Sequence, residues 1–203
     1  MSKSQAEFNA LPENVRLARV LSGTFYYPSV HAPNTSGVKL FGSSPVFTVK
    51  VGLDATNKKI AEEIGLTIKP ASEAIPEEHV EVKRKVDRIG EDGTSYNKQN
   101  KAISVEVVDS MQNKFPKTLL VGNGSKGSVK FATYWYDNNG GGVGTSLYKM
   151  QVTSLVEFEH AKDDDFVTDD TGFSISDVVA DDVPFDMDTP KEAQAVGASL
   201  FDD

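Results

Sequence analysis

Three consecutive aromatic residues, Tyr134, Trp135 and Tyr136, follow a segment that also contains Lys130. In a β-strand successive side chains point to opposite faces, so Trp135 would face one side and both tyrosines would share the other side with Lys130. Aromatic rings stack on unpaired bases and lysines neutralise phosphates, so such a face suits single-stranded nucleic acid. Tyrosines that merely rim a hydrophobic core explain the same pattern equally well.

A second aromatic run and several basic residues extend this candidate set. Tyr26 belongs to the aromatic run at 25–27, and the densest basic cluster lies at 83–88. As a group these cations can follow a phosphate backbone, whereas for any single one a solvated strand face is the simpler explanation. The predicted DNA-binding residues are Tyr26, Tyr134, Trp135, Tyr136, Lys83, Arg84, Lys85, Arg88, Lys126 and Lys130.

The glycine-rich segment at 122–127 has the spacing G-x-G-x-x-G of a dinucleotide-binding fingerprint. That fingerprint must open a helix whose N-terminus faces the pyrophosphate, but residues 128–136 alternate as a strand. A P-loop would need Lys and then Ser or Thr after its last glycine, and Ser128 and Val129 follow Gly127 instead. We therefore expect a strand connection here and no nucleotide cofactor.

The remaining polar residues do not form a catalytic or metal-binding motif. The chain has no cysteine, and its three histidines lie far apart, at 31, 79 and 160. The aspartates at 163–165 and 169–170 lack the spacing of a calcium-binding loop. No nucleophile with its base and no pair of catalytic carboxylates can be singled out. We expect a protein that is not an enzyme and needs no metal or cofactor.

Charge divides the chain into two parts. Residues 1–162 contain 20 Lys and Arg against 17 Asp and Glu, a net charge of +3, whereas residues 163–203 contain one Lys against 13 Asp and Glu, a net charge of −12. The negative charges of the second part repel one another, and it has few apolar side chains to bury. We therefore expect a folded domain at 1–162 and a disordered acidic tail at 163–203. This tail contains short apolar segments flanked by aspartates, around Phe185 and Phe201, which we call the apolar plugs. Such segments suit hydrophobic pockets with basic rims on partner proteins. The predicted partner-binding residues are Phe185, Leu200, Phe201, Asp202 and Asp203.

The elements that would position the body's residues are mostly strands. Alternating apolar and polar residues predict strands at 46–53, 103–107 and 147–158, and β-branched and aromatic residues predict strands at 17–27 and 128–136, with 79–89 a weaker candidate. One helix is predicted, with Asp54 as its N-cap and Gly65 as its stop. This set favours a mainly β OB-fold, a five-stranded Greek-key barrel, over a sandwich. No apolar run approaches about 18 residues, so no membrane-spanning helix is expected.

Several short signatures are shared with a known family. They are Val107-Val108-Asp109-Ser110, Leu119-Leu120-Val121-Gly122, Gly124-Ser125-Lys126, Val129-Lys130-Phe131 and Val143-Gly144-Thr145-Ser146. With the strand and helix at 47–65 and the acidic tail, the chain resembles bacteriophage single-stranded DNA-binding proteins of the T7 type. The resemblance implies an OB-fold that coats single strands in phage DNA replication and recombination, in the cytoplasm of the infected bacterial host. It also implies a tail that contacts replication proteins such as DNA polymerase or helicase-primase, and a homodimer as a candidate assembly.

The sequence therefore predicts a sequence-nonspecific single-stranded DNA-binding protein whose acidic tail competes with DNA and recruits replication proteins. Two alternatives remain open. The tail can mimic DNA or recruit a host factor while the body binds protein, or the OB body can bind RNA, because no feature of the sequence reads the 2′-OH.

Overall fold

The computed structural model describes residues 3–158, and residues 1–2 and 159–203 lie outside this described part. Its main sheet has the strand order β3-β2-β1-β8-β9-β7, and a small sheet has the order β4-β5-β6. The strands of the main sheet are β1 (Arg19–Asn34), β2 (Val46–Gly52), β3 (His79–Lys85), β7 (Glu106–Val108), β8 (Lys126–Tyr136) and β9 (Gly142–Ser154). Those of the small sheet are β4 (Arg88–Ile89), β5 (Ser95–Tyr96) and β6 (Ala102–Ile103). The body is mainly β, as the sequence predicts.

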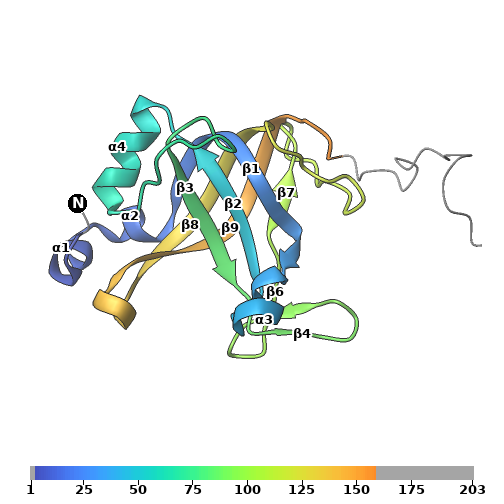
Figure 1. Ribbon diagram of the computed structural model, residues 1–203, viewed down its shortest axis with the longest axis horizontal. Helices are drawn as coiled ribbons and strands as arrows, with labels where there is room; N and C mark the ends of the chain where they lie inside the picture. Colours follow the sequence, from blue (N-terminus) through green and yellow to red (C-terminus); the bar gives the residue numbers. More distant parts are fainter. Residues whose placement is uncertain (1–2, 159–203) are drawn as a thin grey trace, which may run out of the picture. The chain divides into compact units, whose positions relative to one another are not determined.

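Helices cover the two ends of the main sheet. They are α1 (Gln5–Asn9), α2 (Glu13–Leu17), α3 (Ser36–Phe41) and α4 (Ala55–Ile64), with a 3₁₀ turn η1 at Asn138–Gly140. Figure 1 shows α2 and α4 at one end of the long strands and α3, β4 and β6 at the opposite end. The predicted helix is α4: the Asp54 carboxylate accepts a hydrogen bond from the Asn57 N–H at 2.7 Å, and Gly65 ends the helix with φ of 88°.

The sequence analysis missed the three other helices because each has only five or six residues. So short a helix shows no apolar period and depends on its caps and on tertiary packing. In α1, Ser4 and Glu7 form a capping box, and Phe8 is buried. The position of α1 is therefore set by what Phe8 packs against.

Two predicted strands have different bounds from those expected. β1 runs seven residues past the predicted 17–27, through Pro28 and Pro33, with β-bulges between Tyr26 and Asn34. A bulge leaves residues out of the hydrogen-bonded ladder, which is where a strand tolerates proline. Residues 103–107 alternate between buried and exposed, as predicted. They do not form one strand, however, because β6 ends at Ile103 and β7 begins at Glu106.

The last long strand, β9, corrects the prediction of a strand at 147–158. It begins at Gly142 and ends at Ser154, so it starts five residues before the predicted start and ends four residues before the predicted end. A bulge at Tyr148 places Leu147 and Met150 in the core, although three positions separate them. Tyr148, which alternation alone puts on the core face with Met150, is exposed.

The five long strands follow the order β3-β2-β1-β8-β9, which is the order of an OB-fold. The prediction of a closed five-stranded barrel holds only in part, because no backbone ladder joins β3 to β9 within residues 3–158. The Thr145 hydroxyl on β9 links them instead: it accepts the Lys83 N–H at 2.9 Å and lies 3.2 Å from the Lys83 carbonyl oxygen. A short sixth strand, β7, pairs in parallel with β9.

The core lies between the strands and consists mainly of apolar side chains. Phe25 and Leu21 of β1, Phe131 of β8, and Leu147 and Met150 of β9 are fully buried. Burial of each such side chain stabilises the fold by about 1.5–3 kcal/mol before entropy is counted. This core fixes which side chains of each strand are left to face outward.

Candidate nucleic-acid interface

The hairpin formed by β8 and β9 presents the rings of Tyr134 and Tyr136 to solvent, and we call it the tyrosine hairpin. Tyr134 is 49% exposed and Tyr136 is 43% exposed, and they pair across the strands with Gly144 and Gly142. A Cβ on Gly144 would lie 2.5 Å from Tyr134 Cζ, and one on Gly142 would lie 2.6 Å from the Tyr136 hydroxyl oxygen. Each ring therefore lies against a residue without a side chain, which leaves the other side of the ring open. Bases stack on exposed rings of this kind.

The outward side of β2 and β3 carries three lysines. Phe47, Val49 and Val51 of β2 point into the core, so the residues between them point outward. The outward pairs across the two strands are Val46 with Lys85, Thr48 with Lys83, and Lys50 with Glu81. We call these six residues the lysine face.

A cavity of about 420 Å³ joins the lysine face to the tyrosine hairpin. Its lining includes Lys83 and Lys85 of β3 and Tyr134 of β8. The connection between β1 and β2, which contains α3, lines the other side through Ser36 and Ser44. In OB-folds, the face of the second and third strands between the first and last hairpin loops is the usual place for oligonucleotides. The cavity occupies that place here.

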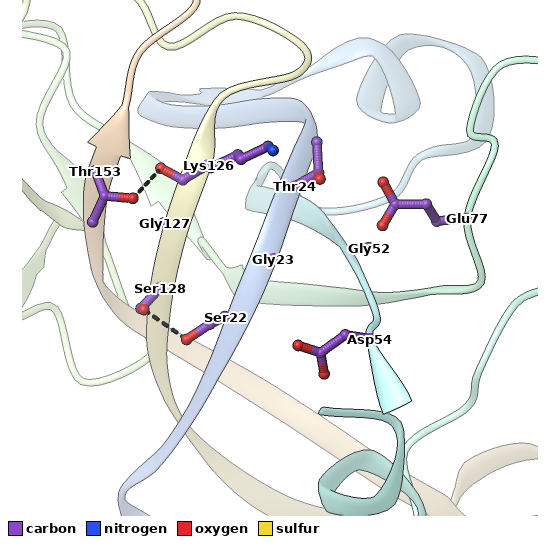
Figure 2. A pocket seen from close by; sticks show the side chains of 10 residues that line it. All are labelled: Ser22, Gly23, Thr24, Gly52, Asp54, Glu77, Lys126, Gly127, Ser128 and Thr153. Atoms are coloured by element: carbon purple, nitrogen blue, oxygen red, sulfur yellow. Dashed lines mark hydrogen bonds between the residues drawn. The ribbon is translucent and has the colours of Figure 1, made fainter. Parts of the chain in front are cut away.

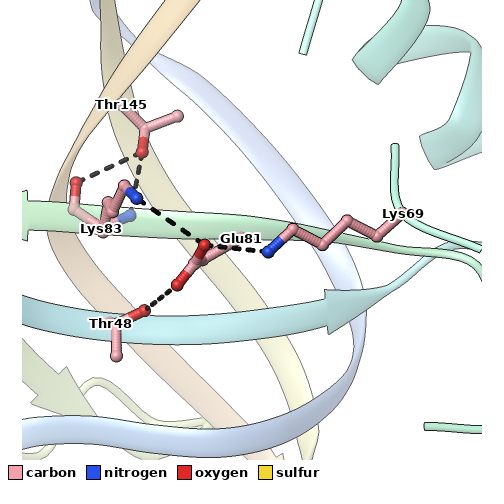
Figure 3. A network of polar contacts seen from close by, with 5 residues as sticks. All are labelled: Thr48, Lys69, Glu81, Lys83 and Thr145. Atoms are coloured by element: carbon pink, nitrogen blue, oxygen red, sulfur yellow. Dashed lines mark hydrogen bonds and ion pairs between the residues drawn. The ribbon is translucent and has the colours of Figure 1, made fainter. Parts of the chain in front are cut away.

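A single carboxylate organises the centre of the lysine face (Figure 3). Glu81 lies 3.2 Å from the Lys69 ammonium and 3.7 Å from that of Lys83, and it accepts a hydrogen bond from the Thr48 hydroxyl at 3.4 Å. Burial opposes ionisation of Glu81, but the neighbouring lysines Lys83, Lys69 and Lys50 outweigh it and hold the pKa of this carboxyl below its usual value. Glu81 therefore stays charged and keeps the lysine side chains gathered around it.

The structure contradicts a stacking role for Tyr26. The residue is only 8% exposed, and its hydroxyl donates a hydrogen bond to Glu77 Oε1 at 2.9 Å. Burial, followed by the bond to Glu77 and the charge of that carboxylate, raises the pKa of Tyr26 to about 12. Tyr26 is therefore buried and bound to Glu77 and offers no free ring for a base.

Three more predicted residues are engaged in local contacts. Trp135 is half-buried against Phe8 of α1, with ring centroids 6.1 Å apart, and its Nε1–H donates to Asp137 at 2.8 Å. Arg84 lies over the Tyr148 ring and donates to the Ser104 carbonyl at 2.9 Å. Arg88 lies over the Tyr96 ring and donates to Asn100 at 2.7 Å. None of the three lines the cavity beside Tyr134.

The last two predicted residues of the body lie on the outer face of β8. Lys130 is exposed and shares that face with Tyr134, about 13 Å further along the strand at the usual rise per residue. Lys126 lines a different hollow, of about 380 Å³, together with Glu77 and Asp54 (Figure 2). Those carboxylates would repel a phosphate, so Lys126 is a poor candidate for a DNA contact.

The predicted partner-binding residues Phe185, Leu200, Phe201, Asp202 and Asp203 lie outside the described residues. Within residues 3–158, no group of three or more His, Asp or Glu side chains could hold a metal ion. Among the helices of the same part of the chain, none is long and apolar enough to cross a membrane.

Several residues of the interface were missed at the sequence level. Lys50 alternates with the core residues of its strand, but the predicted set takes its cations only from 83–88 and 126–130. Gly142 and Gly144 lie before the predicted strand at 147–158, and glycine is more common in turns than in strands. Thr145 carried no local signal, since its role depends on β3, which lies 62 residues away in the sequence.

The sequence and the structure were compared with those of known proteins. No protein-family model and no curated protein matches the sequence. Among solved structures, the single-stranded DNA-binding protein gp2.5 encoded by bacteriophage T7 matches with a TM-score of 0.53 at 18% identity, over 75% of this chain and 98% of that one. A single-stranded DNA-binding protein from bacteriophage Enc34 matches in its truncated form with a TM-score of 0.48 at 12% identity, over 69% of this chain and 87% of that one. The described body therefore has the fold of the phage T7 single-stranded DNA-binding protein.

Proposed function

We propose that this protein binds single-stranded DNA without sequence specificity, through the tyrosine hairpin and the lysine face. The observation that carries the proposal is the cavity in which Tyr134 meets Lys83 and Lys85. These residues come from β3 and β8, which are far apart in the sequence. Together they offer an aromatic ring for a base and positive charges for the phosphates of single-stranded DNA. A ring with one open side accepts a base, and ammonium groups neutralise the phosphates beside it.

The geometry favours a single strand over a duplex. Stacking on Tyr134 and Tyr136 requires a base whose flat side is free, and in a duplex that side is covered by the neighbouring base pairs. Stacking tolerates any base, because every base has a π-face. The lysines are point charges without the planar fork that reads guanine edges, which also fits binding without sequence preference.

The fold shared with the T7 protein supports a place for this chain in phage DNA replication and recombination. That protein is described as a single-stranded DNA-binding protein. We assign no catalysis to this chain and infer that it works by coating single strands in the cytoplasm of the infected host.

The acidic tail at 163–203 is proposed to regulate this binding. Its net charge is −12 against +3 for residues 1–162, so it is an anion tethered to a basic site. Tethering gives such a segment an effective concentration on the order of millimolar. DNA binding would then free the tail, and its plugs around Phe185 and Phe201 would recruit replication proteins such as DNA polymerase or helicase-primase.

Titration of the intrinsic fluorescence tests DNA binding directly. Tyr134 and Tyr136 are exposed, so bases of oligo(dT) stacked on them should quench the intrinsic fluorescence, and added salt should weaken binding. Oligo(rU) and duplex DNA serve as the competing ligands. Tighter binding of oligo(rU) would favour the RNA-binding alternative, and equal binding of duplex would contradict the stacking interpretation.

Removal of residues 163–203 tests the tail. We expect higher affinity for oligo(dT) at low salt and a smaller difference near 1 M salt, where the Debye length falls to about 3 Å. Circular dichroism of the truncated chain is the folding control. Equal affinities at low salt would mean that the tail does not compete with DNA and has only a recruiting role.

A further inference from the structure

We infer that Tyr27 and Lys50 form a second binding station for the same strand of nucleic acid, at the far end of the lysine face from the tyrosine hairpin. This inference rests on the proposed function, because it extends the path of the DNA. It adds two residues that the predicted DNA-binding set does not contain.

The backbone at Tyr27 is held in an unusual conformation. Its φ is 49°, in the left-handed region that non-glycine residues seldom enter, and it lies in the first bulge of β1. Its N–H donates a hydrogen bond to the Asn123 side chain at 2.6 Å. Just before it, the Phe25 N–H and carbonyl bind the backbone of Ser125 and Gly124 at 2.7 and 2.9 Å. The single segment 123–125 thus holds the backbone of β1 at this left-handed residue.

The result of this strain is an exposed ring beside a cation. Tyr27 is 47% exposed, although the two aromatic residues before it are buried. The Lys50 ammonium lies 4.8 Å from the centre of its ring. Residues forced into rare backbone conformations are concentrated at ligand-binding sites, where the strain holds a side chain ready. An exposed ring with a lysine against it repeats the chemistry of Tyr134 beside Lys83 and Lys85.

The two stations lie on one continuous surface. Lys50, Thr48 and Val46 share the outward side of β2, and the pair of Val46 with Lys85 borders the cavity of Tyr134. From Val46 to Lys50 the strand rises by about 13 Å. Lys83 stands opposite Thr48, between the two ends, and Glu81, opposite Lys50, is paired with Lys69 and Lys83, so lysines outnumber the one carboxylate along this path.

A single strand that follows this surface would stack a base on Tyr134, pass its phosphates over Lys83, and stack another base on Tyr27. An oligonucleotide too short to span both stations can use only one of them. Site sizes of OB-folds run from about 4 to about 16 nucleotides, which gives the two lengths for the test.

The test compares Tyr27→Ala with Tyr134→Ala in the full chain, by anisotropy titration with oligo(dT) of about 16 and about 4 nucleotides. We expect Tyr27→Ala to weaken binding of the long oligonucleotide by about 5- to 150-fold, the loss of one stacked base. The short oligonucleotide should lose much less, because it can still bind at Tyr134. Tyr27→Phe keeps the ring and should keep the affinity, and matching thermal melts of all variants exclude unfolding.

Lys50→Gln tests the charge of the same station. It should lower the slope of log affinity against log salt by about 1, whereas Lys59→Gln should not change the slope. Lys59 is the matched control, because it is an exposed lysine on α4.

The outcomes separate this inference from the proposed function. If wild type binds oligo(dT) and Tyr134→Ala weakens it, but Tyr27→Ala binds the long oligonucleotide like wild type, the second station is wrong and the proposed function stands. If wild type binds neither oligonucleotide, the proposed function itself fails, and the second station with it.

Discussion

Gly144→Ala should weaken DNA binding without weakening the fold. The substitution adds a Cβ that would lie 2.5 Å from Tyr134 Cζ, about 1 Å inside ordinary van der Waals contact. The ring must therefore turn away from β9. Because Cζ is at the far end of a side chain that is half exposed, this movement costs little packing. Alanine also reduces the freedom of the unfolded chain, which on its own stabilises by about 0.4–1 kcal/mol.

The expected loss of affinity follows from the stacked base. Stacking of a base on an aromatic ring contributes about 1–3 kcal/mol, so displacement of Tyr134 should weaken oligo(dT) binding by about 5- to 150-fold. The assay is a double-mutant cycle of Gly144→Ala and Tyr134→Ala, with affinities from fluorescence anisotropy and stability from thermal unfolding. Gly142→Ala is the matched comparison, since it should act through Tyr136.

The cycle decides the question because Gly144 is proposed to act only through Tyr134. In a chain that already carries Tyr134→Ala, Gly144→Ala should have almost no further effect on affinity. Independent, additive losses would refute the idea that the glycine positions the ring. A large loss of thermal stability in Gly144→Ala would also contradict the reasoning, because it would mean that the hairpin itself was disturbed.

Three further predictions follow from the lysine face and its surroundings. Lys83→Gln and Lys85→Gln should each reduce the slope of log affinity against log salt by about 1, as measured by titrations at several salt concentrations; an unchanged slope would place the phosphates elsewhere. Tyr26→Phe should lower the free energy of unfolding by about 1 kcal/mol through the lost bond to Glu77, and leave oligo(dT) affinity unchanged; a loss of affinity would return Tyr26 to the interface. Because neighbouring lysines depress the pKa of Glu81, its ionised form stabilises the fold above the ordinary carboxyl pKa, and this contribution is lost as the pH falls through the lower folded pKa. Glu81→Gln should therefore lower the melting temperature at neutral pH and make little difference in acid; an equal effect at both would show that charge is not the cause.

The sequence alone was sufficient for the two sides of β2 and β8 and for the ends of the longest helix, α4. Alternation along β2 and β8 correctly assigned the core side and the outward side, and it placed Tyr134 and Tyr136 outside with Lys130. The caps Asp54 and Gly65 correctly bounded α4. These features are readable because the period of a strand and the chemistry of a helix end are fixed by neighbouring residues.

Only the tertiary structure decided which of these outward residues meet. Tyr26 and Tyr27 are adjacent and chemically alike, yet Tyr26 is buried with its hydroxyl bound to Glu77, and Tyr27, in a left-handed backbone conformation, is exposed. Lys83 comes next to the tyrosine hairpin because Thr145 joins β3 to β9. Such neighbours are set by pairing and bulges between segments far apart in the chain, and the pairing free energy is spread over the whole sheet. No local pattern records it, so the sequence indicated the residue types of the interface, and the fold selected its members.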